Sequence, residues 1–219
     1  MLGPVETTAE IDSTNAELLR RAAAGAPHGI VLVADHQTAG RGRLGRRWEA
    51  ESGAALLVSV LLRPSLPAPR WHLLTFAAGL AAVDAAGGGL KWPNDVVVGS
   101  RKLAGLLAES TADAVVVGMG LNLRRSDVDG AISLEELTGE TDREAVLSRW
   151  LAAFDERLGR LDDLLGEYRS VCSTLGQRVR VDLGTESFEG VATDVTAEGH
   201  LVVDGREVTA GDVVHLRPA

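Results

Sequence analysis

The chain has 219 residues with 22 basic and 31 acidic side chains, which gives a formal net charge of -9 at pH 7. This acidity argues against a protein that binds nucleic acid through bulk positive charge. With 45% hydrophobic and 24% charged residues, the composition is typical of one large globular domain, alone or with a small second one, and it excludes disordered and fibrous classes.

Targeting and redox signals point to the cytoplasm. Residues 1–10 lack the basic and apolar segments of a signal peptide, and the longest apolar run, residues 54–62, is about half a membrane span. The single cysteine, Cys172, permits no internal disulfide and fits a reducing compartment. We expect Cys172 to be a buried structural thiol, although a nucleophilic role stays open.

Charge and lysine are unevenly distributed along the chain. Residues 1–105 carry 11 basic and 9 acidic side chains, whereas residues 106–219 carry 11 and 22. Both of the chain's lysines, Lys91 and Lys102, fall in one short stretch, and every other basic residue is arginine. We therefore expect an anionic substrate to bind to the first half of the chain.

The predicted elements begin with a helix over residues 15–24. Thr14, with Glu17 three residues later, predicts its capping box. A mostly apolar strand is predicted over residues 29–35. It is followed by a polar, glycine-rich loop over residues 38–53, and loops of this length are usually functional or mobile.

The middle of the chain predicts strands around a second helix. Residues 54–63 form a continuous apolar strand, and residues 70–86 form an alanine- and leucine-rich helix that is closed by three glycines. Residues 90–98 and 101–109 should pair as a hairpin, which would set Lys102 across from the strand that carries Asn94 and Asp95. A further buried strand is predicted over 113–121.

The last third of the chain predicts two helices and a separate β unit. Capping-box patterns at Ser133 and Thr141 indicate two helix starts, the second helix running to about Cys172. From Leu175, short alternating apolar segments are separated by glycines. They predict a small all-β unit that closes on itself like a barrel.

The glycine-rich loop has chemistry suited to an anion. Residues 40–48 read Gly-Arg-Gly-Arg-Leu-Gly-Arg-Arg-Trp. Glycines let backbone N–H groups approach a ligand closely, and guanidinium groups are planar donors to carboxylate or phosphate. The loop is neither a P-loop nor a dinucleotide fingerprint. A solvated basic loop and an arginine–glycine RNA-binding segment are alternatives.

A second cluster combines both lysines with an amide and a carboxylate. Residues 91–95 read Lys-Trp-Pro-Asn-Asp, and residues 101–105 read Arg-Lys-Leu-Ala-Gly. Proline within a strand occurs at an edge or a bulge, so Pro93 predicts a strand irregularity that changes the direction of nearby side chains. The ammonium group of lysine is a compact positive charge. It can stabilise a carboxylate oxygen while that oxygen becomes part of a phosphoanhydride. A structural ion-pair network is the alternative.

Five segments in the same order resemble the motif set of biotin protein ligases. They are Ser13-Thr14-Asn15, Gln37 with residues 40–45, residues 91–95, residues 101–105 and Gly118-Met119-Gly120-Leu121-Asn122. The resemblance implies an α+β fold with a mixed β-sheet and helices on one face, the class II synthetase-like biotin/lipoate ligase catalytic domain, over residues 1–173. It also implies a small C-terminal SH3-like β-barrel over residues 174–219.

The resemblance implies a two-step reaction with biotin and ATP, the latter accompanied by Mg²⁺. Biotin's carboxylate attacks the α-phosphate of ATP to give biotinyl-5′-adenylate and pyrophosphate. A lysine in a biotin carboxyl carrier domain of a biotin-dependent carboxylase then displaces AMP. No metal held by the protein alone is expected, because the histidines show no ligand spacing. The motif at Ser13 leaves no room for the DNA-binding domain of some family members, and we expect neither DNA nor membrane as a partner. A monomer and a homodimer stay open.

The resemblance also assigns roles to individual residues. The catalytic residues are Lys102, Arg43 and Asp95. The biotin-binding residues are Ser13, Thr14, Asn15, Gln37, Gly40, Arg41, Gly42, Arg43, Lys102 and Gly105. The nucleotide-binding residues are Arg41, Arg43, Trp48, Lys91, Asn94, Gly118, Gly120 and Asn122. Asp95 is assigned to orient or deprotonate the acceptor amine, or to position Mg²⁺.

One detail and two rival functions stay open at this stage. Because a capping Thr14 is poorly placed to bind a ligand too, Ser13 is the preferred ligand contact. A lipoate or octanoate transferase is the nearest rival, but a purely apolar acyl chain would not need polar residues such as Ser13 and Gln37. The non-enzymatic rival is a regulatory module that binds biotin or nucleotide, or an RNA binder, and it would not consume ATP.

Overall fold

The computed structural model of the chain describes residues 2–125 and 128–216. The strands of its large sheet are β1 Val5–Ile11, β2 Val31–Gln37, β3 Ala55–Leu62, β4 Gly89–Lys91, β5 Asp95–Val98, β6 Arg101–Ser110 and β7 Val115–Asn122. The helices are α1 Thr14–Ala23, α2 His72–Ala86, α3 Leu134–Thr138, α4 Arg143–Leu158 and α5 Leu164–Val171. The strands of the small sheet are β8 Arg178–Asp182, β9 Ser187–Val195, β10 Leu201–Val203, β11 Arg206–Val208 and β12 Asp212–His215.

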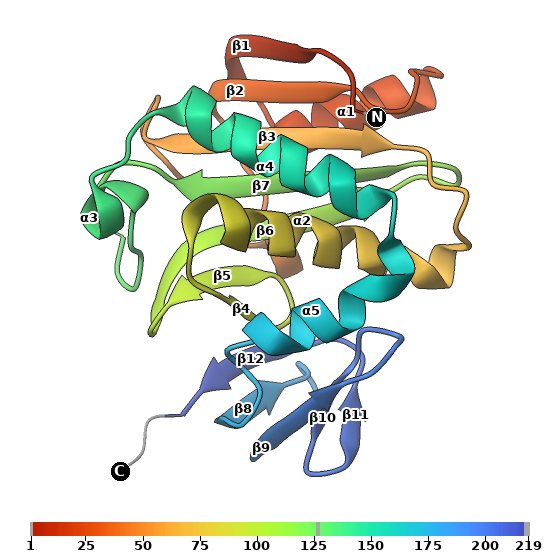
Figure 1. Cartoon of the computed structure of the whole chain (residues 1–219), viewed down its shortest axis with the longest axis vertical. Helices are drawn as coiled ribbons and strands as arrows, with labels where there is room; N and C mark the ends of the chain where they lie inside the picture. The colour runs from red at the N-terminus through yellow and green to blue at the C-terminus, as the bar shows by residue number, and fades with distance from the viewer. Residues whose placement is uncertain (1, 126–127, 217–219) are drawn as a thin grey trace.

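The large sheet is mixed, as predicted. Its strand order is β1-β2-β3-β7-β6-β5-β4, and β1 pairs with β2 in parallel while all other neighbours are antiparallel. The small sheet has the order β11-β10-β9-β8-β12 and is antiparallel throughout. Figure 1 shows it below the large sheet, next to α5. In the part of the chain that is described, no helix is long and apolar enough to cross a membrane.

The inner strand β3 is buried on both faces, and helices pack on each side of it. Figure 1 shows α2 and α4 crossing in front of β3, β7 and β6, which is the expected helical face. Leu56 and Val58 of β3 pack in the core on that side. Leu61 points the other way and packs with Leu18 and Ala22 of α1. The predicted helical face is confirmed, and α1 adds a single helix on the opposite face.

Two predicted helix caps are displaced by one residue. Ser13, not Thr14, is the N-cap of α1, and its Oγ accepts a hydrogen bond from the backbone N–H three residues on, at 3.4 Å. Asp142, not Thr141, caps α4 in the same way, at 3.0 Å. The Thr14 hydroxyl is engaged elsewhere, because it donates to Gln37 Oε1. The capping box predicted at the start of α3 is confirmed.

The predicted long helix from Thr141 to Cys172 is wrong, because the segment forms two helices. α4 ends before Gly159, a short 3-10 turn follows, and α5 begins at Leu164. The break lets α5 fold back onto α2, where Tyr168 stacks on Phe76 at a ring-centroid distance of 3.8 Å. Both aromatic side chains are thereby buried.

The single strand predicted over residues 90–98 is also two strands. Residues 92–94 form a turn with a cis Trp92–Pro93 peptide bond, and β4 pairs antiparallel with β5. The hairpin of β5 and β6 is confirmed. Strand β1 was not predicted, because most of its side chains are exposed and polar and give no apolar pattern. The short apolar segments that follow Leu175 form the strands of the small sheet, as predicted.

The packing of α1 predicts a clear difference between two neighbouring leucines. Leu18 is fully buried, whereas Leu19 is only partly buried against the same cluster. Leu18→Ala should lower the free energy of unfolding by about 2–5 kcal/mol, because it leaves a cavity between α1 and the sheet. Urea denaturation checks this, with Leu19→Ala as the matched control. An equal loss for both variants would contradict the assigned orientation of α1.

Candidate active site

One row of paired residues across the sheet carries four predicted site residues. Lys91 pairs with Asp95, Asp95 with Gly105, Gly105 with Gly120, and Gly120 with Leu57. Residues directly opposite each other in neighbouring strands point to the same face of a sheet. The side chains of Lys91 and Asp95 therefore rise on the α1 side of the sheet, beside a stretch of bare backbone.

The glycines of β6 and β7 form a trough in this face. A Cβ at Gly118 would lie 2.2 Å from Asn15 Oδ1, and one at Gly120 would lie 2.4 Å from Cε2 of Trp48. A Cβ at Gly105 would lie 2.9 Å from Nζ of Lys102. The distances at Gly118 and Gly120 are far inside van der Waals contact, so glycine at these two positions lets Asn15 and Trp48 lie against the strand.

A β-bulge directs Lys102 into the trough. The pairing of β5 with β6 shifts register between Val96 and Val97, so that Val97 lies opposite Lys102 while Val96 lies opposite Ala104. The extra residue in β6 reverses the alternation of side chains at this point. Without the bulge, Lys102 would share a face with Ala104, whose side chain lies in the core below the sheet.

Lys102 forms an ion pair at the centre of the site. Its Nζ lies 2.7 Å from Oδ1 of Asp95, and the two side chains are 39% and 24% exposed. The same Nζ lies 5.5 Å from the centroid of the Trp48 ring. A cation that is partly shielded by an aromatic ring and remains open to solvent is available to an anionic ligand.

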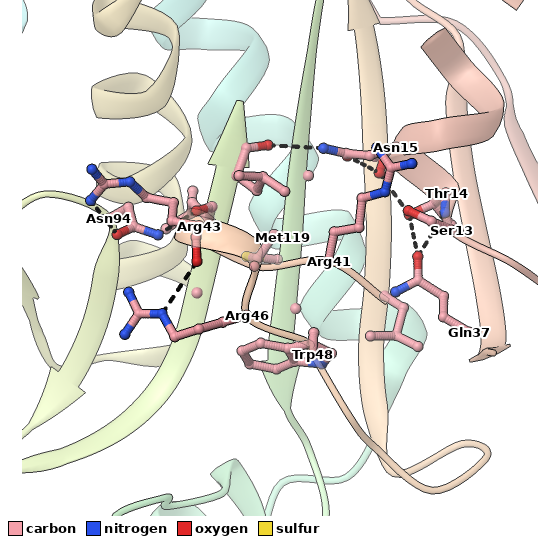
Figure 2. A pocket seen from close by; sticks show the side chains of 18 of the residues that line it. Ser13, Thr14, Asn15, Gln37, Arg41, Arg43, Arg46, Trp48, Asn94 and Met119 are labelled. Carbon is pink, nitrogen blue, oxygen red and sulfur yellow. Dashed lines mark hydrogen bonds between the residues drawn. The ribbon is translucent and has the colours of Figure 1, made fainter. Parts of the chain in front are cut away.

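Polar side chains of α1, β2 and β3 form a hydrogen-bonded group at the other end of the pocket (Figure 2). The backbone N–H and the hydroxyl of Thr14 donate to Gln37 Oε1, at 2.6 and 2.9 Å. Ser59 Oγ lies 2.7 Å from Thr14 Oγ1 and 2.6 Å from Asn15 Oδ1. Because the Gln37 oxygen is taken by Thr14, its amide N–H groups are left to face a ligand.

The glycine-rich loop is a folded hairpin whose arginines contact three different elements. Arg41 bonds Glu109 of β6 at 3.0 Å, Arg43 bonds Asn94 at 3.3 Å, and Arg46 bonds Asp212 of β12 at 2.8 Å. The loop strands meet in a bridge between Arg41 and Arg47. Burial lowers the pKa of the Arg43 guanidinium. A desolvated guanidinium attracts an anion more strongly than one in water.

The pocket brings most of the predicted site residues together. Among the sequence-predicted residues, those that line it are Ser13, Thr14, Asn15, Gln37, Arg41, Gly42, Arg43, Trp48, Asn94, Asp95, Lys102, Gly105, Gly118 and Gly120. Sequence reasoning missed Arg46, Arg47, Leu57, Val58, Ser59, Leu106, Leu107 and Met119, which also line it. Ser59 had a usable signal, because it is the one polar residue in the apolar run of residues 54–62.

Three predicted residues lie outside this lining. Gly40 is at the base of the loop, where its carbonyl accepts from the Trp48 N–H at 3.1 Å. Asn122 donates to the backbone oxygen of Lys102 at 3.2 Å and lines an adjoining pocket with Trp48. Lys91 is half-buried beside Asp95.

Lys91 is a cation with an unusual environment. Burial lowers the pKa of its ammonium, although the charges of Asp95 and Asp212 oppose that change. Among the described residues, no carboxylate lies within salt-bridge distance of Lys91. A half-buried ammonium without a direct counter-ion is costly unless a ligand supplies one.

Cys172 does not belong to the pocket. It is buried, forms a backbone bridge with Leu90, and is absent from the lining. Burial raises the pKa of its thiol, which disfavours the nucleophilic thiolate. The structural thiol predicted from the sequence is therefore the better description.

Comparison with known proteins gives a consistent result. Residues 8–123 match the biotin/lipoate A/B protein ligase family, and residues 174–216 match the biotin protein ligase C terminal domain. The chain is 42% identical to the biotin–acetyl-CoA-carboxylase ligase of Mycobacterium tuberculosis, over 97% of this chain and 89% of that protein. It is 32% identical to the bifunctional ligase/repressor BirA of Escherichia coli, over 92% of this chain and 70% of that protein.

A solved structure is also similar over nearly the whole chain. It is the biotin protein ligase of Aquifex aeolicus in complex with biotin and ATP. The TM-score is 0.84 at 30% sequence identity, and the match covers 98% of this chain and 99% of that one.

The trough predicts that glycine is required at position 118. Gly118→Ala should lower the free energy of unfolding by about 1–3 kcal/mol, because the added methyl overlaps Asn15 Oδ1. Gly166→Ala in α5 is the control: nothing lies within 4 Å of its Cβ position, and alanine favours the helix. Chemical denaturation of both variants checks the prediction. A Gly118→Ala protein as stable as the unchanged one would contradict the close contact.

Proposed function

This chain belongs to the biotin protein ligase family, and we propose on that premise that it joins biotin to a lysine of an acceptor protein with consumption of ATP. The observation that carries the proposal is the layout of the pocket. A neutral hydrogen-bonding group at Thr14 and Gln37 lies at one end, and cations at Lys102 and Arg43 lie at the other. Biotin has the matching polarity, with a neutral ureido ring and an anionic carboxylate.

The ureido end is assigned to the polar group around α1. The amide N–H groups of Gln37 suit the ureido oxygen, and the hydroxyls of Thr14 and Ser59 suit its N–H groups. The preference for Ser13 over Thr14 as ligand contact loses its reason, since Ser13 caps the helix and Thr14 does not. Asn15 Oδ1 contacts the Ser59 hydroxyl and lies against Gly118. Asn15 therefore supports this polar group and closes the pocket next to Gly118.

The carboxylate end is assigned to Lys102 and the loop. Lys102 and Arg43 would neutralise the biotin carboxylate and the α-phosphate, which otherwise repel each other as they approach. Gly42 and Gly105 leave room for the chain of the acid. The loop over the pocket keeps water from the acyl-adenylate, whose hydrolysis competes with transfer.

The nucleotide is assigned to the neighbouring pocket beside Trp48. Trp48 offers a stacking surface, Asn122 lines the same pocket, and Gly120 allows close approach. Arg41 and Asn94, which line the main pocket, and the half-buried Lys91 are proposed as further nucleotide contacts. Mg²⁺ bound with ATP needs only one or two protein carboxylates beside the phosphates, and Asp95 fits that demand. When bound, the ion would neutralise phosphate charge.

Asp95 is also proposed to act in the transfer step. The Asp95 carboxylate forms an ion pair with Lys102, which is assigned to the biotin carboxyl group. A lysine amine that attacks the carboxyl carbon of biotinyl-adenylate would therefore come close to Asp95. It can orient that amine or accept its proton. We propose a biotin carboxyl carrier domain of a biotin-dependent carboxylase as acceptor, which the name of the Mycobacterium tuberculosis relative supports. We propose that residues 1–173 form the catalytic domain and that residues 174–219 form a second domain. The reaction would take place in the cytoplasm, where ATP is abundant.

The proposed activity is tested by mass spectrometry of a carrier domain. Incubation of the protein with biotin, ATP, Mg²⁺ and a purified carrier domain should add one biotinyl group to the carrier. Omission of ATP should abolish the product. A carrier that stays unmodified while the protein is folded would count against the proposal.

Lys102 is expected to be the main electrostatic catalyst. Lys102→Gln should slow formation of biotinyl-adenylate about 10²–10³-fold without unfolding the protein. Arg101→Gln is the matched control, because Arg101 pairs with Glu136 outside the pocket. Pyrophosphate release in the absence of acceptor measures both rates. Equal rates in the two variants would remove Lys102 from its role.

We expect Lys91 to bind the nucleotide and to lower the stability of the folded protein. Lys91→Met should raise the free energy of unfolding, because burial disfavours the ammonium in the folded protein. The same change should raise KM for ATP about 10–100-fold, since a hydrogen bond to a charged group is lost. KM for biotin should stay within about twofold. An unaltered KM for ATP would exclude the nucleotide role.

A further inference from the structure

A continuous chain of hydrogen bonds links the arginine loop to the ureido end of the pocket. Arg41 and Asn15 both donate to Glu109. Asn15 Oδ1, Ser59 Oγ, Thr14 Oγ1 and Gln37 Oε1 then lie within hydrogen-bonding distance one after another, and the backbone N–H of Thr14 also donates to Gln37. Arg41 and Gln37, the two ends of the chain, both line the pocket. Glu109, near its middle, does not line that pocket and has no role in the function proposed above.

Glu109 joins a buried side chain to a half-exposed one. Its Oε1 accepts from Nη1 of Arg41 at 3.0 Å, and its Oε2 accepts from Nδ2 of Asn15 at 2.9 Å. Asn15 is 4% exposed and is fixed in α1. The Arg41 side chain is 50% exposed and comes from the loop. Each oxygen of the Glu109 carboxylate thus accepts from one partner. Because Asn15 is buried, it fixes the carboxylate, and the carboxylate in turn fixes the position of the Arg41 guanidinium.

The ion pair is placed where it can hold the loop down. Arg41 directly follows Gly40 and lies in the first strand of the loop hairpin, where it forms a bridge with Arg47. Figure 2 shows its side chain crossing the pocket toward Asn15 and Thr14. Glu109 is 26% exposed, so the carboxylate of the pair is partly shielded from solvent. Asn15 Nδ2 has a second acceptor in the backbone oxygen of Leu107, at 3.2 Å. Asn15 therefore does not depend on Glu109 alone.

We propose that Glu109 is a positioning residue that latches the arginine loop over bound biotinyl-adenylate, acting through Arg41. The inference rests on the function proposed above. The latch slows the departure of the intermediate before an acceptor arrives. Glu109 does not line the pocket, so its carboxylate is not required for the adenylation step itself.

Glu109→Gln tests the latch with little change of shape. A glutamine carbonyl oxygen can still accept from Asn15 Nδ2, but the amide N–H group that replaces Oε1 cannot accept from Arg41. Without acceptor protein, biotinyl-adenylate should leave this variant about three- to tenfold faster. The maximal rate of adenylation at saturating biotin and ATP should stay within about twofold. Rapid dilution and chromatographic detection of free biotinyl-adenylate measure the release.

Salt and a second substitution separate a latch from a merely structural carboxylate. Release from the unchanged protein should accelerate with ionic strength, because the pair is partly exposed, whereas release from Glu109→Gln should respond much less. In a double-mutant cycle, Glu109→Gln should add nothing to the effect of Arg41→Gln. Glu189→Gln is the control, because it removes a surface pair with Arg178 in the small sheet.

The outcomes distinguish the latch from the function on which it rests. If the unchanged protein forms no biotinyl-adenylate, the proposed function is wrong. If it does, and Glu109→Gln releases the intermediate at the unchanged rate, the latch is wrong while the function stands. Additive effects of the Arg41 and Glu109 substitutions would also overturn the latch.

Discussion

Close approach to bare backbone is the constraint on which the rest of the site depends. Gly118 and Gly120 of β7 leave a trough that Asn15 and Trp48 enter from outside the sheet. Methyl groups there would push both side chains outward. The bulge in β6 then delivers Lys102 to the same trough. A flat, regular sheet with ordinary side chains would offer neither the room nor the charge, so the two irregularities together make the pocket.

The layers of the fold were predictable where apolar patterns were long. The continuous apolar run that became β3 and the alanine-rich α2 were both recognised, because burial on all sides leaves few polar residues. Edge strand β1 was missed, since an exposed strand needs no apolar pattern. The break between α4 and α5 was missed as well, because it depends on how Tyr168 meets α2, which is a tertiary contact.

The composition of the site was more predictable than its geometry. Motif residues such as Lys102 and Gln37 could be named from their spacing and from the resemblance to biotin protein ligases. Which hydroxyl caps α1 could not, because Ser13 and Thr14 both suit a cap and only the contact with Gln37 decides. The partners of the loop arginines were also out of reach, as they come from strands distant in the sequence.

The most direct test of the account is to offer the protein ATP with biotin, lipoate or octanoate in separate reactions and to weigh the acyl-adenylates formed. A pocket with a hydrogen-bonding end at Thr14 and Gln37 and a cationic end at Lys102 predicts biotinyl-adenylate alone. Equal or greater yields of lipoyl- or octanoyl-adenylate would contradict the assignment of the polar end, because an apolar acyl chain cannot satisfy its hydrogen bonds.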